Sequence, residues 1–210
     1  LLHSAYRLWM NGPNQLKKDF KDARFLHVST DEVYGTLGDT GLFTETTAYA
    51  PNSPYSASKA SSDFIVRSYF HTYGMPVVTT NCSNNYGARQ HKEKLIPTII
   101  RKALSGREIP IYGNGKNIRD WIFVEDHCNA IFNILTNGKS GESYNISASN
   151  EINNITIVKK ILALMNKSED LIEFVEDRPG HDFRYSMEST KIRNNLGWSQ
   201  NKKIEEGLKK

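Results

Sequence analysis

Short apolar segments alternate along this chain with longer segments whose apolar residues recur every three or four positions. Residues 24–29 (RFLHVS) predict a buried strand, and residues 75–80 (MPVVTT) predict the next one. Between them, residues 56–73 carry a helical pattern that ends at Gly74. Strands that alternate with helices of this length predict an α/β fold with a parallel sheet.

The rest of the chain continues this alternation. Residues 1–9 predict the end of a helix, which is broken at Asn11-Gly12-Pro13. Further helices are predicted at 95–104, 124–136 and 155–165, and short strands at 109–112 and 144–146, the first of them closed by a Gly113-Asn114-Gly115 turn.

Composition excludes several classes of protein. With 38% hydrophobic and 24% charged residues, the chain has the make-up of a folded domain, and no apolar run approaches the roughly 20 residues that cross a bilayer. Cys82 and Cys128 lack metal-ligand spacing, which favours a reducing compartment, the cytoplasm. The net charge of +4 suits a phosphorylated small substrate as well as a nucleic acid, but no nucleic-acid motif occurs. We therefore expect neither a membrane nor a nucleic-acid partner.

Tyr55 and Lys59 stand four residues apart at the start of the predicted helix, so they share one face and can meet a common ligand. A lysine ammonium beside a phenol favours the phenolate and brings its pKa, normally about 10, toward the range of a useful base. The pair predicts a catalytic base. The alternative is an exposed helix turn without such a role.

Three polar residues, Thr30, Asp31 and Glu32, follow the predicted strand 24–29. The carboxyl end of a strand is the edge at which α/β sheets bind ligands. A hydroxyl and two adjacent carboxylates at this edge can act on one substrate from several directions. The alternative is a strand-ending turn with solvated acids.

These two motifs belong to a longer ordered series that spans nearly the whole chain. The series runs STDEVYG (29–35), YSASKA (55–60), TNCSNNYG (80–87), EKLIP (93–97), PIYGNGKNIRDW (110–121), VEDH (124–127), YNI (144–146) and DRPGHD (177–182). In this order the motifs resemble the dTDP-glucose 4,6-dehydratases, which are NAD-dependent members of the extended short-chain dehydrogenase/reductase superfamily. The resemblance implies a partial Rossmann-like, doubly wound parallel sheet with a smaller mixed α/β region that binds the nucleotide sugar.

The resemblance also implies a division of the chain. Residues 1–87 would form the later part of the dinucleotide-binding domain, and residues 88–210 mainly the substrate-binding region, with some segments returning to the sheet. A dehydratase of this kind begins with a strand, a Gly-x-x-Gly-x-x-Gly turn and a helix that receives the NAD pyrophosphate, and this sequence has no such turn. We therefore expect an N-terminally truncated chain that is poorly stable and inactive by itself.

The implied activity is the dehydration of dTDP-glucose to a 4-keto-6-deoxy sugar, with NAD as a recycled cofactor. Tyr55 would take the proton of the sugar 4-hydroxyl as hydride leaves carbon 4, Thr30 would hydrogen-bond the same oxygen, and Lys59 would tune Tyr55 and hold the nicotinamide ribose. Glu32 would then remove the carbon 5 proton while Asp31 protonates the departing 6-hydroxyl, and hydride would return to carbon 6. Adjacent carboxylates push their pKa values apart, but only the resemblance decides which one is protonated.

Binding residues follow from the same resemblance. Cofactor contacts would come from Ser29, Tyr55, Lys59 and Asn85. Substrate contacts would come from Asn84, Lys94, Leu95, Pro110, Ile111, Tyr112, Arg119, Asn154 and the run of Asp177, Arg178, Pro179, Gly180 and His181. Arginine side chains can offer forked donors to a diphosphate, and Tyr112 or Leu95 can cover a flat base. We predict no metal site, because the histidines lack a ligand pattern.

Other functions stay open at this point. A different nucleotide-sugar enzyme, such as a 4-epimerase or a decarboxylase, would share Tyr55 and Lys59 but would not need the acid pair. A non-catalytic protein that binds sugar nucleotides would also fit a truncated chain. No residue decides between thymine and uracil as the base. The resemblance further implies a homodimer formed by the helices at 1–9 and 56–73 of each subunit.

Overall fold

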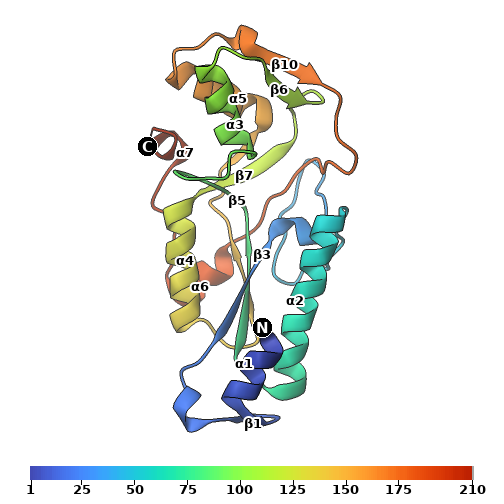
Figure 1. The fold of residues 1–210 in the computed structure, drawn as a ribbon, viewed down its shortest axis with the longest axis vertical. Coiled ribbons are helices and arrows are strands. Elements are labelled where there is room, and N and C mark those ends of the chain that lie inside the picture. Colours follow the sequence, from blue (N-terminus) through green and yellow to red (C-terminus); the bar gives the residue numbers. More distant parts are fainter. Residues whose placement is uncertain (210) are drawn as a thin grey trace.

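A computed structural model describes residues 1–209, and Figure 1 shows an elongated molecule with a body of strands flanked by helices and a second region at one end. The helices are α1 (Leu2–Trp9), α2 (Pro54–Tyr73), α3 (Leu95–Leu104), α4 (Val124–Asn137), α5 (Asn154–Leu164), α6 (Thr190–Leu196) and α7 (Ile204–Gly207). The strands are β1 (Met10–Gly12), β2 (Gln15–Leu16), β3 (Phe25–Thr30), β4 (Val77–Cys82), β5 (Asn84–Tyr86), β6 (Ile109–Tyr112), β7 (Ile118–Phe123), β8 (Ser143–Ile146), β9 (Glu151–Asn153) and β10 (Ile172–Val175). The predicted α/β class is confirmed.

The body of the molecule is a parallel sheet of β3, β4 and β8, with β4 in the centre. Successive residues of a strand point to opposite faces. Accordingly, Val77 joins an apolar cluster with Val66 of α2, whereas Val78 joins another with Ile134 of α4 and Ile192 of α6. Helices therefore cover both faces of the sheet (Figure 1), as in a doubly wound fold.

The second region holds two small sheets, β5-β7-β9 and β6-β10. Helices α3 and α5 pack beside them around a core that includes Ile99, Ile111, Trp121 and Ile157. After β10 the chain runs back toward the body. There, the backbone of Tyr185 donates to the carbonyl of Ile118, and the backbone of Phe43 donates to that of Ser186. We call this returning segment, residues 182–189, the strap.

Several elements differ from the sequence-based prediction. Strand β4 starts at Val77 rather than at residue 75, because Gly74 takes a left-handed φ of 65° and the Met75 amide still bonds to Tyr69. Strand β7 (IRDWIF) was not predicted, since burial of nearly every residue removes the alternation that marks a strand. Val28 of the predicted buried strand is 39% exposed, because β3 is an edge strand within residues 1–209.

Candidate active site

Strand β3 ends in a turn that fixes Thr30, Asp31 and Glu32. Thr30 is the N-cap of a 3₁₀ helix (Asp31–Tyr34): its Oγ1 accepts from the Glu32 amide at 3.3 Å and donates to Asp31 Oδ1 at 3.1 Å. The Asp31 side chain is buried, whereas Glu32 is partly exposed. The turn therefore places two adjacent carboxyl groups in different surroundings.

Burial and charge shift the pKa values of both acids. Burial, followed by the neighbouring Glu32, raises the pKa of Asp31 to about 7. Burial also raises the pKa of Glu32, but the positive charges of Arg119, Arg178 and Lys94 oppose that rise. Burial thus favours the protonated form of Asp31, whereas the surrounding cations favour the ionised form of Glu32.

Helix α2 presents the other two predicted catalytic residues. Its start is fixed by a capping box between Ser53 and Ser56, with Pro54 in the first turn. Tyr55 follows with 55% of its surface exposed, and one turn later the Lys59 Nζ donates to the carbonyl of Val28 at 2.7 Å. The pKa of Tyr55 is raised, first by burial and then by Glu32 and other negative groups, so the lowering by Lys59 that the sequence led us to expect does not occur here.

The cations around Glu32 include three residues that the resemblance assigned to the substrate. Lys94 is the N-cap of α3, and Arg178 lies in the loop after β10. Arg119 is buried on β7, and its guanidinium donates to the backbone carbonyls of residues 118, 182 and 183 and lies 4.4 Å from the centre of the Tyr185 ring. Its donors therefore hold the strap in this structure rather than facing open solvent.

A second group of predicted substrate residues gathers where β6 and β10 end. His181 Nδ1 lies 2.7 Å from Asp177 Oδ1, and the His181 ring meets Tyr112 edge to face with 6.3 Å between centres. Arg178, Pro179 and Gly180 are exposed. The Ile111 side chain is 2% exposed and packs within the core, so a substrate contact by this residue stays a prediction. The remaining predicted residues of this region are the partly buried Leu95, Pro110 and Asn154.

The predicted cofactor residues come from three elements: Ser29 lies on β3, Tyr55 and Lys59 on α2, and Asn85 on β5. The Ser29 hydroxyl donates to Asp63 Oδ2 at 2.8 Å. Asn84 pairs with Trp121 in the β5-β7 ladder, and the Asn85 side chain donates to the Ser83 carbonyl. Asn85 Oδ1 and Asp31 Oδ2 are buried without a hydrogen-bond partner. Buried polar atoms are rarely left unpaired, so each of these two can accept a hydrogen bond from a ligand. Buried atoms of Asn81, Ser83, Tyr86, Gln90, Trp121 and His127 also lack a partner.

Several residues that surround the site were not predicted. Asp63 follows Lys59 by one helical turn, so the helical spacing of α2 carried a signal for it. Tyr185 and Asp182 are joined by a hydrogen bond between the Tyr185 hydroxyl and Asp182 Oδ2, and both belong to the irregular strap. Asp182 closes the DRPGHD motif (177–182), whereas neither a motif nor a periodic pattern marks Tyr185.

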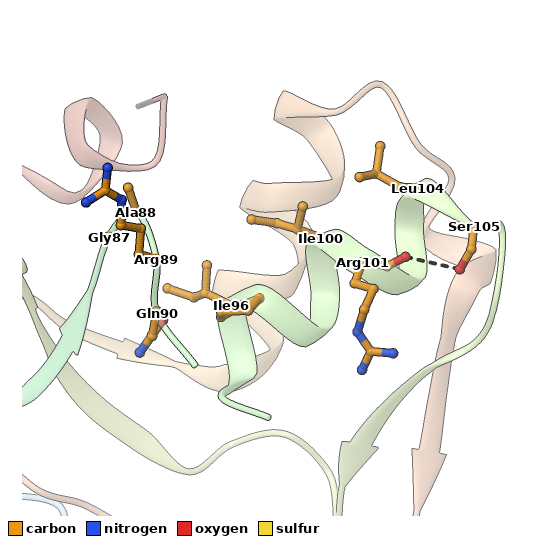
Figure 2. Close-up of a pocket in the computed structure, with 10 residues that line it drawn as sticks. Gly87, Ala88, Arg89, Gln90, Ile96, Ile100, Arg101, Leu104 and Ser105 are labelled. Carbon is orange, nitrogen blue, oxygen red and sulfur yellow. Dashed lines mark hydrogen bonds between the residues drawn. The ribbon is translucent and has the colours of Figure 1, made fainter. Parts of the chain in front are cut away.

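Two hollows lie apart from the acid pair. One, of about 550 Å³, lies between the loop at residues 87–90 and helix α3; Figure 2 shows Ile96, Ile100 and Leu104 along this helix. The other, of about 240 Å³, is lined in part by Tyr49, Asp63 and Arg67. Neither of these two hollows includes Asp31, Glu32 or Tyr55 in its lining.

Comparisons with known proteins agree with this geometry. A family model described as GDP-mannose 4,6 dehydratase matches residues 2–210. The dTDP-glucose 4,6-dehydratase of Xanthomonas campestris is 52% identical to the chain over 99% of its residues, which span 61% of that relative. The crystal structure of the Bacillus anthracis dTDP-glucose 4,6-dehydratase in complex with NAD superimposes with a TM-score of 0.86 at 50% identity, covering 89% of this chain and 59% of that one. The Streptomyces venezuelae dTDP-glucose 4,6-dehydratase with NAD and TYD bound gives a TM-score of 0.87 at 44% identity, covering 89% and 57%.

The chain thus spans about 61% of the length of the curated relatives that it matches. Within residues 1–209, no helix is both long enough and apolar enough to cross a lipid bilayer. The same residues hold no cluster of three or more His, Cys, Asp or Glu side chains that could bind a metal ion.

Proposed function

Because the chain belongs to the GDP-mannose 4,6-dehydratase family, we propose that the protein carrying it dehydrates dTDP-glucose to dTDP-4-keto-6-deoxyglucose with NAD as cofactor. Support for the substrate comes from relatives of about 50% identity with that activity in their names. The observation that carries the proposal is the acid pair, in which a buried Asp31 with a pKa raised to about 7 adjoins a Glu32 surrounded by positive charge.

Each residue of the pair has a distinct part in this reaction. Elimination of water needs a base for the carbon 5 proton and an acid for the 6-hydroxyl at the same time. Glu32, with Arg119, Arg178 and Lys94 favouring its ionised form, is the base, and Asp31 is the acid. Tyr55 takes the proton of the 4-hydroxyl, and Thr30 hydrogen-bonds the same oxygen.

The residues of this chain fit the nicotinamide end of NAD. Tyr55 is 55% exposed, Lys59 Nζ reaches the Val28 carbonyl of β3, and Asn85 Oδ1 is buried without a hydrogen-bond partner. In this fold a dinucleotide binds at the carboxyl ends of the strands. Bound there, NAD would accept a hydride from carbon 4 and return it at carbon 6. Ser29 contributes through its place on β3, since its hydroxyl is engaged with Asp63.

The nucleotide end of the substrate is proposed to lie over the second region. The proposed contacts come from Asn84, Lys94, Leu95 and Asn154, together with the segment from Asp177 to His181 and Pro110, Ile111 and Tyr112, with Ile111 contributing through its backbone. This arrangement corresponds to the proposed division of the chain into a dinucleotide-binding part, residues 1–87, and a mainly substrate-binding part, residues 88–210. The proposed site for the diphosphate lies between them, near Arg178.

An assay of the reading frame that carries this chain tests the proposal. Incubated with dTDP-glucose and NAD, the parent should form a 4-keto sugar, followed by its absorbance in alkali. Glu32→Gln should lose nearly all product, whereas Glu173→Gln, an exposed change on β10, should retain it. A folded parent that leaves dTDP-glucose unchanged would instead favour the sugar-nucleotide-binding protein.

A 4-epimerase is the competing enzyme. An epimerase returns hydride to carbon 4 and expels no hydroxyl. It therefore offers Asp31 no leaving group to protonate. Product analysis separates the two, because only dehydration removes the oxygen from carbon 6.

We also propose a homodimer in a reducing, cytoplasmic compartment. Leu8 of α1 and Phe64 and Ile65 of α2 are each more than half exposed, and pairing of these helices would cover them. Cys82 and Cys128 form no disulfide, which fits a reducing compartment. Light scattering that gives the mass of a single subunit would exclude the dimer.

A further inference from the structure

One buried carboxylate outside the catalytic set has three side-chain hydrogen-bond partners. Asp63 of α2 is 4% exposed. Its Oδ2 accepts from the Ser29 hydroxyl at 2.8 Å and from the Tyr49 hydroxyl at 3.0 Å, and its Oδ1 lies 2.9 Å from His27 Nε2. An ionised carboxylate only accepts, and all three neighbours can donate, so Asp63 satisfies the three groups at once.

Asp63 and its partners come from three different parts of the chain. His27 and Ser29 belong to β3, and Ser29 immediately precedes Thr30. Tyr49 belongs to the loop before α2, where its ring packs against Tyr34 at 5.2 Å between ring centres. Asp63 lies on α2, one turn after Lys59. The carboxylate thus joins the helix with one half of the candidate catalytic residues to the strand with the other half.

A second bond between the same two elements lies one turn nearer the site. It runs from Lys59 Nζ to the carbonyl of Val28, the residue between His27 and Ser29. Asp63 and Lys59 therefore link α2 to β3 by hydrogen bonds at two successive turns of the helix. Without Asp63, the junction keeps one polar bond, and that bond uses a side chain proposed to hold the cofactor.

We propose that Asp63 is a positioning residue, which fixes Tyr55 and Lys59 of α2 relative to Thr30, Asp31 and Glu32 at the end of β3. The inference rests on the proposed dehydratase function. Asp63 does not touch the reacting atoms; it acts through Ser29 and the backbone of β3. A shift of about 1 Å between reacting groups can cost roughly 100-fold in rate, so a loosened junction should appear in turnover.

The test compares Asp63→Asn with the parent and with Arg67→Gln in the reading frame that carries this chain. Asparagine keeps the volume, but its amide replaces one acceptor oxygen, and the Ser29 and Tyr49 hydroxyls can turn to accept, so the protein should still fold. Arg67 lies one turn further along α2, is exposed and lines the same hollow as Asp63, which makes it the matched control. We expect Asp63→Asn to lower kcat roughly 10- to 100-fold with KM for dTDP-glucose within about twofold.

A double-mutant cycle with Ser29→Ala shows whether Asp63 acts through β3. If it does, the combined variant should lose no more activity than Asp63→Asn alone, because both changes break the same link. Additive losses, or a kcat for folded Asp63→Asn within twofold of the parent, would overturn the proposal.

Hydrogen–deuterium exchange separates this result from a failure of the proposed function. Amides of residues 28–32 and 53–59 should exchange faster in Asp63→Asn than in Arg67→Gln, whether or not the parent acts on dTDP-glucose. An inactive parent with this exchange pattern would refute the dehydratase function but keep the anchoring role of Asp63. Unchanged exchange in both segments would refute the anchoring role itself.

Discussion

Two strand ends are proposed to contact the substrate, and they differ in burial and in hydrogen bonding. At the end of β3, Asp31 is buried and Thr30 bonds both to it and to the next backbone amide. After the end of β10, residues 177–180 are exposed, and the notable side-chain bond joins Asp177 to His181. Both segments carry acids, but only the first keeps one away from water.

This difference in burial indicates which strand end can transfer a proton and which can only bind a ligand. Burial is what moves the pKa of Asp31 to about 7, into the range where an acid can both hold and release a proton. At Asp177 the neighbouring His181 lowers the pKa instead, so this carboxylate stays ionised and can only accept hydrogen bonds or attract cations. We therefore assign proton transfer to the first strand end and ligand binding to the second.

The largest effect that tests this contrast should come from Asp31→Asn. The amide cannot deliver a proton to the leaving hydroxyl, so kcat on dTDP-glucose should fall by about 100- to 10,000-fold with little change in KM. Steady-state kinetics on the folded variant check this. A fall of less than tenfold would mean that water or another group protonates the leaving group, and the contrast between the two strand ends would fail.

The same variant makes a prediction about pH. Because folding raises the pKa of Asp31 from 3.8 to about 7, the folded protein binds the proton more tightly, and stability from this group is lost as pH rises through about 7. Asparagine does not titrate. Relative to the parent, Asp31→Asn should therefore gain stability between pH 4 and 7, by at most about 4 kcal/mol, and gain no more above it. Urea titrations across this range measure the difference, and a constant difference would show that Asp31 is not protonated in the folded state.

An intermediate effect should come from the strap that covers the first strand end. Met187 is 1% exposed in a cluster with Val33 and Tyr34, which follow the acid pair directly. Met187→Ala should lower the free energy of unfolding by about 2–5 kcal/mol. Phe183→Ala is the matched control, because Phe183 lies on the same strap but is 40% exposed, and its loss should cost far less. Equal losses would show that the strap is not anchored through this cluster.

The sequence predicted the first strand end better than the second region. Thr30, Asp31 and Glu32 could be placed because they follow a short apolar run, and a strand end in an α/β fold has a known relation to ligands. The burial that separates Asp31 from Glu32 could not be predicted, because it depends on tertiary packing that no local pattern reveals. Likewise, Arg119 was expected to bind a phosphate, but no local pattern reveals that its donors hold backbone carbonyls of the strap.

Strand β7 itself shows why the second region was harder to predict. Its residues are buried on both faces, so apolar and charged residues follow one another without alternation. Asp120 is fully buried, and the backbone amides of Ala148 and Asn150 donate hydrogen bonds to its carboxylate. Such a strand becomes recognisable only once its neighbours β5 and β9 are known.

The smallest effect is expected at the second strand end. Asp177→Asn keeps an acceptor for the His181 ring but removes the charge of a carboxylate that is 44% exposed, whereas the His181 side chain is 5% exposed. If this end only binds, the variant should raise KM for dTDP-glucose a few-fold, by roughly 1 kcal/mol or less, and leave kcat within about twofold. If Asp177→Asn lowers kcat as strongly as Asp31→Asn does, the loop after β10 takes part in the chemistry. Leaving both constants unchanged would place the nucleotide elsewhere, because a carboxylate in contact with the substrate cannot lose its charge without altering affinity.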